Sequence, residues 1–427
     1  MSPSLLSLVF VAALLASLLV KLWLATRQIR HVSTHRDAVP APFAERVTLE
    51  AHRKAADYTV AKLRFGLLTM AFGTVVLVGW TLLGGLDALN GAVREAVQPR
   101  WGTLAYEVAL VIAFSLIGAL LDLPFEAYAT FRLEQRFGYN RITPRLFVLD
   151  LLRNTAIGLA LGVPILALVF WLMSVAGTLW WLWAWFAWAG YALLMQVVYP
   201  LVIAPLYNKF EPLADETLDA RVRALMSRCG FALKGLFVMD GSKRSAHSNA
   251  YFTGIGASKR VVFYDTLVRQ LTPPELEAVL AHELGHFKLK HVQKGMVLMF
   301  ALSLAGLALL GWVSTQAWFY LAFGVQPSMQ SSNNAVALIL LALVVPVFGF
   351  FVQPLLARFS RKHEFEADAY ACAKADGREL AAALLKLHQD NASTLTPDPL
   401  YVRFYYSHPP ASERLAALPQ SPTPQAG

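Results

Sequence analysis

Charged residues are scarce in this chain of 427 residues. Asp, Glu, Lys and Arg make up 15% of it, whereas soluble domains contain about 25%. Hydrophobic residues make up 56% of the chain, and the mean hydropathy is +0.48. This composition excludes a disordered chain, a collagen-like chain and an ordinary soluble enzyme. An integral membrane protein remains.

Cysteine is almost absent, since the chain contains only Cys229 and Cys372. Two cysteines are too few for a disulfide scaffold, so nothing in the sequence requires an oxidising compartment. The net charge of +9 is high enough to raise the question of nucleic-acid binding. In membrane proteins, however, basic residues gather on cytoplasmic loops. We therefore expect a lipid bilayer as the partner, and no nucleic acid.

Long apolar runs predict seven transmembrane helices, because a spanning helix needs about 20 apolar residues. They lie near residues 4–24, 65–86, 104–123, 147–173, 178–206, 296–320 and 335–357. No basic residue precedes the first run, and Lys21 lies near its end. This is the reverse of a cleaved signal peptide, so we expect a retained membrane anchor.

The distribution of Lys and Arg predicts the orientation in the membrane. Eight lie between the first and second runs, four between the third and fourth, and thirteen in residues 207–295. The alternate links hold two, none and none. By the positive-inside rule, the N-terminus lies outside, and both the 207–295 segment and the C-terminal region face the cytoplasm.

The remaining segments complete the expected domain organisation. Residues 1–206 hold five spans and 296–357 hold two. Residues 207–295 are long enough for a small α/β subdomain, with strands at 236–239 and 260–264 and a helix over 273–291. Residues 358–418 are expected to be helical, and 419–427 form a Pro-rich tail that cannot build a core. The fold class is mainly α, with a small β element.

The strongest functional pattern is His282-Glu283-Leu-Gly-His286. On a helix, residues i and i+4 share one face about 6 Å apart, so both imidazoles can bind one tetrahedral zinc, while Glu283 reaches the metal-bound water. Thr272 and Glu275 stand at capping-box spacing ahead of it, with prolines at the first helical positions. The pattern predicts a zinc-dependent metallopeptidase.

Three candidates compete for the third ligand position. His291 lies five residues beyond the second histidine, about 140° off the ligand face of a continuous helix, and is expected to face solvent. An astacin-type extension would need a glycine and a histidine where Leu289 and Val292 stand, so it is excluded. Glu364 is favoured, with Asp368 on the same helical face to orient a histidine.

These motifs together resemble the type I CAAX prenyl proteases, a family of integral-membrane zinc metalloproteases. The resemblance spans nearly the whole chain and rests on the seven predicted spans and the zinc motif. It also rests on 364–368 and on two longer signatures at 244–252 and 406–414. It implies a fold of seven tilted helices around a water-filled chamber, joined to a zincin-type protease domain.

The resemblance also implies roles for individual residues. His282, His286 and Glu364 would hold one zinc ion per chain, Glu283 would act as general base, and Asp368 would support the metal site. His408 would stabilise the oxyanion. Three residues would contact substrate: Asn249 on an edge strand, His247 in the same signature, and Arg414 near the substrate's C-terminal end.

The sequence leaves the substrate and the source open. A CAAX-type protease acting on lipidated or hydrophobic peptides, a broad quality-control protease and a non-catalytic transporter or lipid-binding protein are the alternatives. The four intact zinc-motif residues argue against the last. Arg outnumbers Lys by 24 to 13, which favours a bacterial inner membrane over an ER membrane and a substrate that need not be prenylated.

Overall fold

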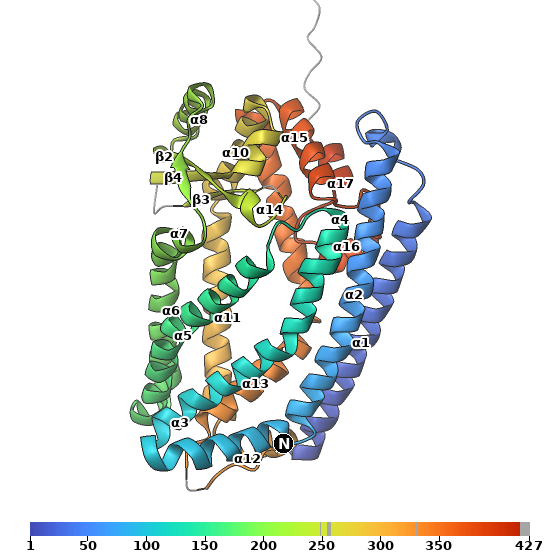
Figure 1. Ribbon diagram of the computed structural model, residues 1–427. Coiled ribbons are helices and arrows are strands. Elements are labelled where there is room, and N and C mark those ends of the chain that lie inside the picture. The colour runs from blue at the N-terminus through green and yellow to red at the C-terminus, as the bar shows by residue number, and fades with distance from the viewer. Residues whose placement is uncertain (248, 254–257, 330, 419–427) are drawn as a thin grey trace, which may run out of the picture.

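The structure is a computed structural model that describes all residues except 248, 254–257, 330 and 419–427. The predicted tail therefore lies outside the described residues. Most of the chain is helical, and the helices extend below a small mixed domain that contains the only sheet among the described residues (Figure 1). The structure confirms the predicted fold class, a polytopic helical protein with a small β element.

Six apolar helices are long enough to cross a membrane, and a seventh span is possible as a broken pair. The six helices are α1 (Pro3–Thr34), α2 (Leu49–Thr81), α3 (Gly85–Tyr128), α5 (Pro144–Val175), α6 (Trp180–Val198) and α11 (His291–Val313). The broken pair is α13 (Asn334–Gly349) and α14 (Gln353–Lys374), bent by 69°. The short elements joining these helices are η1 (Ala41–Phe43), η2 (Ala129–Glu134), α4 (Gln135–Phe137), η3 (Gly177–Leu179), η4 (Tyr199–Ile203), α7 (Ala204–Tyr207) and α12 (Ala317–Ala322).

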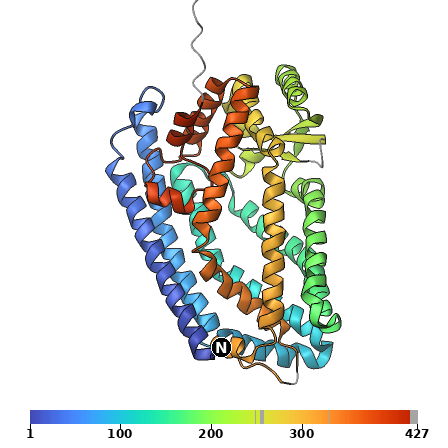
Figure 2. The ribbon, with the colours of Figure 1, turned by 180° about the vertical axis from the view of Figure 1, so that it is seen from behind.

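The spanning helices do not pack into a solid bundle. Between 0 and 17% of the residues in their apolar windows are buried inside the protein, although every one of these helices is rich in Leu, Val and Ala. Both views show α1 and α2 side by side at one side of the molecule, and α6 and α11 side by side at the other (Figures 1 and 2). Several of the spanning helices contribute to one apolar cluster, which includes Phe10, Tyr106 and Phe170 together with Phe323 after α12.

Four strands form the sheet of the small domain. They are β1 (Phe210–Pro212), β2 (Ala232–Met239), β3 (Ala250–Thr253) and β4 (Ser258–Tyr264), in the order β1-β2-β4-β3. The two predicted strands are β2 and β4, which pair in parallel, while β3 runs antiparallel to β4. Because β3 is last in the order, its outer side is an edge of the sheet.

The segment before α11 and the segment after α13 share one hydrophobic core. It joins β2 and β4 to the helices that pack over the sheet and includes Leu225, Phe263, Leu284, Ala371 and Leu380. The helices of this domain are α8 (Glu216–Cys229), η5 (Gly241–Lys243), α9 (Asp265–Gln270), α10 (Pro273–Lys288), α15 (Gly377–Asp390), α16 (Pro399–Tyr405) and α17 (Ala411–Ala417). Helix α10 therefore packs against α14, although two membrane segments separate them in sequence.

Candidate metal centre and active site

Helix α10 begins where the sequence predicts. Thr272 and Glu275 form the capping box, and the Thr272 backbone N–H donates to Glu275 Oε2 at 2.7 Å. Lys386 on α15 binds the same carboxylate oxygen at 2.7 Å. Leu280 and Leu284 on this helix are buried in the domain core, and this packing sets the rotation of the helix and therefore the direction of its histidines.

Three side chains from α10 and α14 converge. His282 Nε2 lies 3.2 Å from His286 Nε2 and 3.5 Å from Glu364 Oε2, while His286 Nε2 lies 3.3 Å from Glu364 Oε1. Ligands bound tetrahedrally at about 2.0–2.1 Å from zinc stand about 3.3 Å apart. Glu364 is 4% exposed, and its Oε2 has no hydrogen-bond partner. A divalent cation among the three groups would satisfy that orphaned oxygen, so the residues fit a metal site.

A glycine allows the two helices to approach closely. A Cβ at Gly285 would lie 3.1 Å from Ala367 Cα and 3.2 Å from Ala367 O on α14. Gly285 stands between the two histidines, and Ala367 stands three residues after Glu364. The glycine in the motif therefore brings the histidine face of α10 within reach of the Glu364 carboxylate.

His282, His286 and Glu364 are called the metal cluster below. The buried carboxylate of Asp368 contacts His282 at the ring nitrogen that faces away from this cluster. His282 Nδ1 donates to Asp368 Oδ1 at 2.8 Å, and Arg414 donates to both Asp368 oxygens, at 2.8 and 2.5 Å. Burial lowers the pKa of His282, but its contacts with Asp368 and Glu364 outweigh burial and raise the pKa to about 9. Asp368 thus stands where such a carboxylate fixes the tautomer of a liganding histidine, leaving Nε2 free for the metal.

His286 has a similar partner that the sequence argument missed. His291 is only 5% exposed, its Nδ1 lies 3.1 Å from His286 Nδ1, and its Nε2 lies 2.9 Å from Glu366 Oε2. The prediction that His291 faces solvent on a helix over 273–291 is therefore wrong. Helix α10 ends at Lys288, Lys290 adopts φ 60°, and α11 begins at His291. The break turns the imidazole back toward the metal cluster.

The same neighbourhood contains a second group of possible ligands, namely His291, His363 and Glu366. Its geometry disfavours a metal. The two imidazole rings are stacked, with centroids 4.0 Å apart and planes 9° from parallel. A histidine binds a metal in its own ring plane, and two nearly parallel planes do not meet near the rings. The contact between His291 and Glu366 is instead an ordinary hydrogen-bond distance.

Glu283 faces a cavity beside the metal cluster. The cavity has a volume of about 360 Å³ and is also lined by His286, Glu364 and, from the edge strand β3, Tyr251 and Phe252. The predicted general base and the sheet edge therefore border the same space. Asn249 directly precedes β3 and accepts a backbone hydrogen bond from Tyr264 at 3.0 Å.

The other predicted substrate or catalytic residues occupy three different settings. His408 is 67% exposed at its side chain, and its Nε2 lies 3.4 Å from Glu364 Oε1. His247 stacks on Tyr139 and its Nδ1 lies 3.1 Å from Asn391 Oδ1. Arg414 is buried against Asp368, as described above. Its guanidinium donates to Asp368, and its role near the substrate's C-terminal end stays a prediction.

Comparison with known proteins covers nearly the whole chain. Residues 28–209 match the family described as "CAAX prenyl protease N-terminal, five membrane helices", and residues 212–421 match "Peptidase family M48". A CAAX prenyl protease 1 homolog from Arabidopsis thaliana is 34% identical, over 87% of this chain and 88% of its own length. CAAX prenyl protease 1 from Saccharomyces cerevisiae is 32% identical, over 93% and 91%.

A solved structure agrees with these matches. The crystal structure of S. mikatae Ste24p superposes with a TM-score of 0.89 at 30% identity, covering 96% of this chain and 98% of that one. The fold and the matches together define a multi-pass membrane metalloprotease. The chain belongs to the M48 peptidase family, within the CAAX prenyl protease group. Membership implies a metal and a peptide or protein substrate.

Proposed function

We propose that the protein is a zinc-dependent endopeptidase of the membrane that cleaves CAAX-type peptides near their C-terminus. The observation that supports this most directly is the convergence of His282, His286 and Glu364, with Glu283 at the same cavity. In this proposal those three side chains hold one zinc ion. Bound there, zinc supplies Lewis-acid chemistry, polarising a carbonyl and acidifying water.

Side chains of the protein transfer the protons and stabilise the charge that develops during the reaction. Glu283 accepts the proton of the attacking water and passes a proton to the departing amine. His408 donates a hydrogen bond to the oxyanion, a contact worth about 2.7–4 kcal/mol when well placed. Asp368 orients His282 through the 2.8 Å contact. The edge strand β3, next to Asn249, binds extended substrate through backbone hydrogen bonds.

The substrate class follows from the relatives and from the shape of the fold. Proteins named CAAX prenyl protease match over most of this chain, and a CAAX motif is a C-terminal tetrapeptide whose cysteine carries a prenyl chain. A lipidated or otherwise hydrophobic peptide would lie against the apolar spans, in which few side chains are buried inside the protein.

The orientation is also part of the proposal. With the N-terminus outside, the small domain and the metal cluster lie on the cytoplasmic side, where C-terminal peptides of cytoplasmic proteins are accessible. The alternation of Lys and Arg between the spans supports this orientation. A bacterial inner membrane remains the favoured location from the excess of Arg over Lys.

The substitution Glu283→Gln tests the reaction. It keeps the size of the side chain and removes its ability to accept a proton. We expect peptide cleavage to fall by about 10²-fold or more, as for loss of a general base, while elemental analysis still finds one zinc per chain. Turnover equal to that of the unaltered protein would contradict the proposal.

A further inference from the structure

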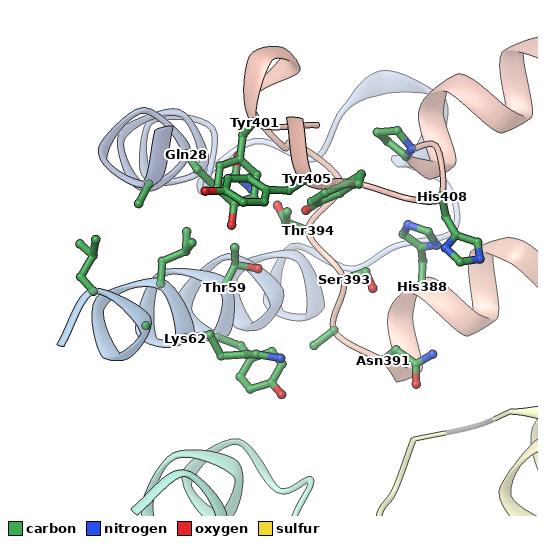
Figure 3. Close-up of a pocket in the computed structure, with 18 of the residues that line it drawn as sticks. Gln28, Thr59, Lys62, His388, Asn391, Ser393, Thr394, Tyr401, Tyr405 and His408 are labelled. Carbon is green, nitrogen blue, oxygen red and sulfur yellow. The ribbon is translucent and has the colours of Figure 1, made fainter. Parts of the chain in front are cut away.

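A second, larger pocket of about 670 Å³ adjoins the metal cluster. His408 lines this pocket and also lies 3.4 Å from Glu364, which borders the cavity of Glu283. The contact between His408 and Glu364 therefore lies between the two spaces. Figure 3 shows His408 and His388 at one end of the pocket, with Tyr401 and Tyr405 opposite the helix that carries Lys62.

The pocket is long enough for several residues of extended peptide. Helix α2 lines it from Tyr58 to Met70, a rise of about 18 Å at 1.5 Å per residue. Three extended residues span about 10 Å. Leu63, Leu67 and Met70 contribute to this wall at helical spacing, so the pocket presents an apolar surface to aliphatic side chains.

Two ammonium groups stand in this pocket without an acidic partner. Lys21 of α1 and Lys62 of α2 both line it, and among the described residues neither belongs to an ion pair. Their recorded contacts are with aromatic rings, Lys21 at 4.8 Å from the ring centroid of Phe350 and Lys62 at 4.9 Å from that of Tyr58. The carboxylate of Glu134 accepts a hydrogen bond from the Tyr58 hydroxyl at 2.6 Å and forms an ion pair with neither lysine.

Lys21 lies near the end of the apolar run of α1, where a lysine side chain usually extends to the interface. Here it is half-buried and lines the pocket. Together with Lys62 it places positive charge, without an ion-pair partner in the described part of the chain, in a largely apolar pocket. The ligand that complements this surface has aliphatic groups and ends in an anion.

We propose that this pocket binds the residues on the C-terminal side of the cleaved bond, and that Lys62 and Lys21 bind the free carboxylate that ends the substrate. The proposal rests on the proposed function and extends it. Backbone hydrogen bonds along β3 recognise little of the substrate's sequence. A site for the terminal carboxylate would let the protease select the end of a chain, because an internal segment carries no such group. An anionic lipid headgroup has the same charge, and the experiment separates the two.

The test measures binding without turnover, in the Glu283→Gln protein. Two prenylated CAAX peptides of one sequence are compared, one ending in a free acid and one in an amide, in nanodiscs of neutral lipid. We expect the acid to bind with a Kd about tenfold lower, as for a hydrogen bond to a charged group. In the double variant Lys21→Gln/Lys62→Gln the ratio of the two Kd values should fall to about one.

Lys54 provides the matched control. It lies on the same helix, two turns before Lys62, and its ammonium group lies 4.9 Å from the Tyr139 ring centroid, outside the pocket. Lys54→Gln removes the same charge and should keep the tenfold ratio. The single variant Lys62→Glu, at an exposed position, should favour the amide over the acid and requires no change at the half-buried Lys21.

Two results would overturn the proposal. They are equal binding of acid and amide in neutral lipid by the protein with both lysines, and a tenfold ratio that persists in the double variant Lys21→Gln/Lys62→Gln. If the two peptides bind equally while anionic lipid binds more weakly to the double variant, the lysines bind a headgroup instead. Cleavage of both peptides by the unaltered chain, abolished by Glu283→Gln, would still leave the proposed function standing. If the unaltered chain cleaves neither peptide, both the proposed function and the carboxylate-binding proposal are contradicted.

Discussion

At the scale of single residues, the proposed metal site includes groups that do not touch the metal position. Asp368 contacts Nδ1 of His282, and His291 contacts Nδ1 of His286, so both imidazoles present Nε2 to the proposed metal position. Partners of this kind fix the tautomer and the ring orientation, and their loss costs about 10–100-fold in metal affinity. The contact between His291 and His286 leads to a specific prediction.

His291→Ala should weaken metal binding by about 10–100-fold, because His286 then loses the contact at Nδ1. Competition with a chelator measures this directly, with no need for turnover. Glu366→Gln is the matched variant, since an amide still offers His291 a hydrogen-bond acceptor, and its effect should be smaller. A chelator titration unchanged in His291→Ala would show that His286 needs no such support.

His388 gives a prediction about pH. Burial, and next the charge of Arg414, lower the pKa of this imidazole from 6.5 to about 4. Between pH 6.5 and 4 the unfolded chain therefore binds more protons than the folded one, and the free energy of unfolding decreases as the pH falls through that range. Above pH 6.5 the effect is absent.

The thermal unfolding midpoint in detergent, measured at pH 7 and pH 5, tests this assignment. His388→Gln should lose less stability between the two pH values than the unaltered protein, because glutamine does not titrate. An identical loss in both proteins would show that His388 takes up its proton without cost in the folded state.

Among single residues, the sequence predicts which side chains meet but only part of what supports them. The pair His282 and His286 follows from motif spacing and Glu364 from the comparison of three candidates, and the structure brings the three within 3.5 Å of one another. Asp368 is likewise expected beside a histidine and contacts His282. The placement of His291 does not follow, since the helix breaks at Leu289-Lys290 without a glycine or proline to signal it. The pairing of Arg414 with Asp368 joins distant helices, which no local pattern encodes.

At the scale of secondary-structure elements, the contact between α10 and α14 decides whether the ligands can meet. Gly285 faces Ala367 at a distance that a methyl group cannot enter freely. Gly285→Ala should therefore move α10 away from α14, at a cost of about 1–3 kcal/mol. We expect both a lower unfolding midpoint and weaker metal binding.

Gly295→Ala is the control for that substitution. Gly295 lies within α11, and a Cβ there meets no atom within 4 Å. Replacing a helical glycine by alanine at an open position stabilises a helix by about 0.5–1 kcal/mol. Equal behaviour of the two alanine variants would show that the contact with Ala367 does not constrain the site.

The starts of the helices are a further feature that local sequence patterns do not predict. The apolar runs predict the spans because hydrophobic length is a local property, but α2 begins at Leu49 and α3 at Gly85, well before the runs at 65 and 104. Polar residues continue both helices beyond the apolar part. Helix α3 kinks at Gly102, where φ is +82°, and this separates its polar start from its apolar continuation.

At the scale of the whole molecule, the membrane helices assemble the site. His282 and Glu364 lie on opposite sides of α11 and α13 in the sequence, and the two segments return to share one core. The antiparallel course of the last spans thus brings α14 against α10 (Figure 1). Only the assembled fold places a carboxylate from α14 beside the two imidazoles of α10.

The central claim is that these distant side chains hold one metal ion, and elemental analysis of purified protein tests it most directly. We expect one zinc per chain in the unaltered protein and in Glu283→Gln, and a value close to zero in Glu364→Ala after dialysis against a mild chelator. One tightly held zinc per chain in Glu364→Ala, or none in the unaltered protein, would contradict the account.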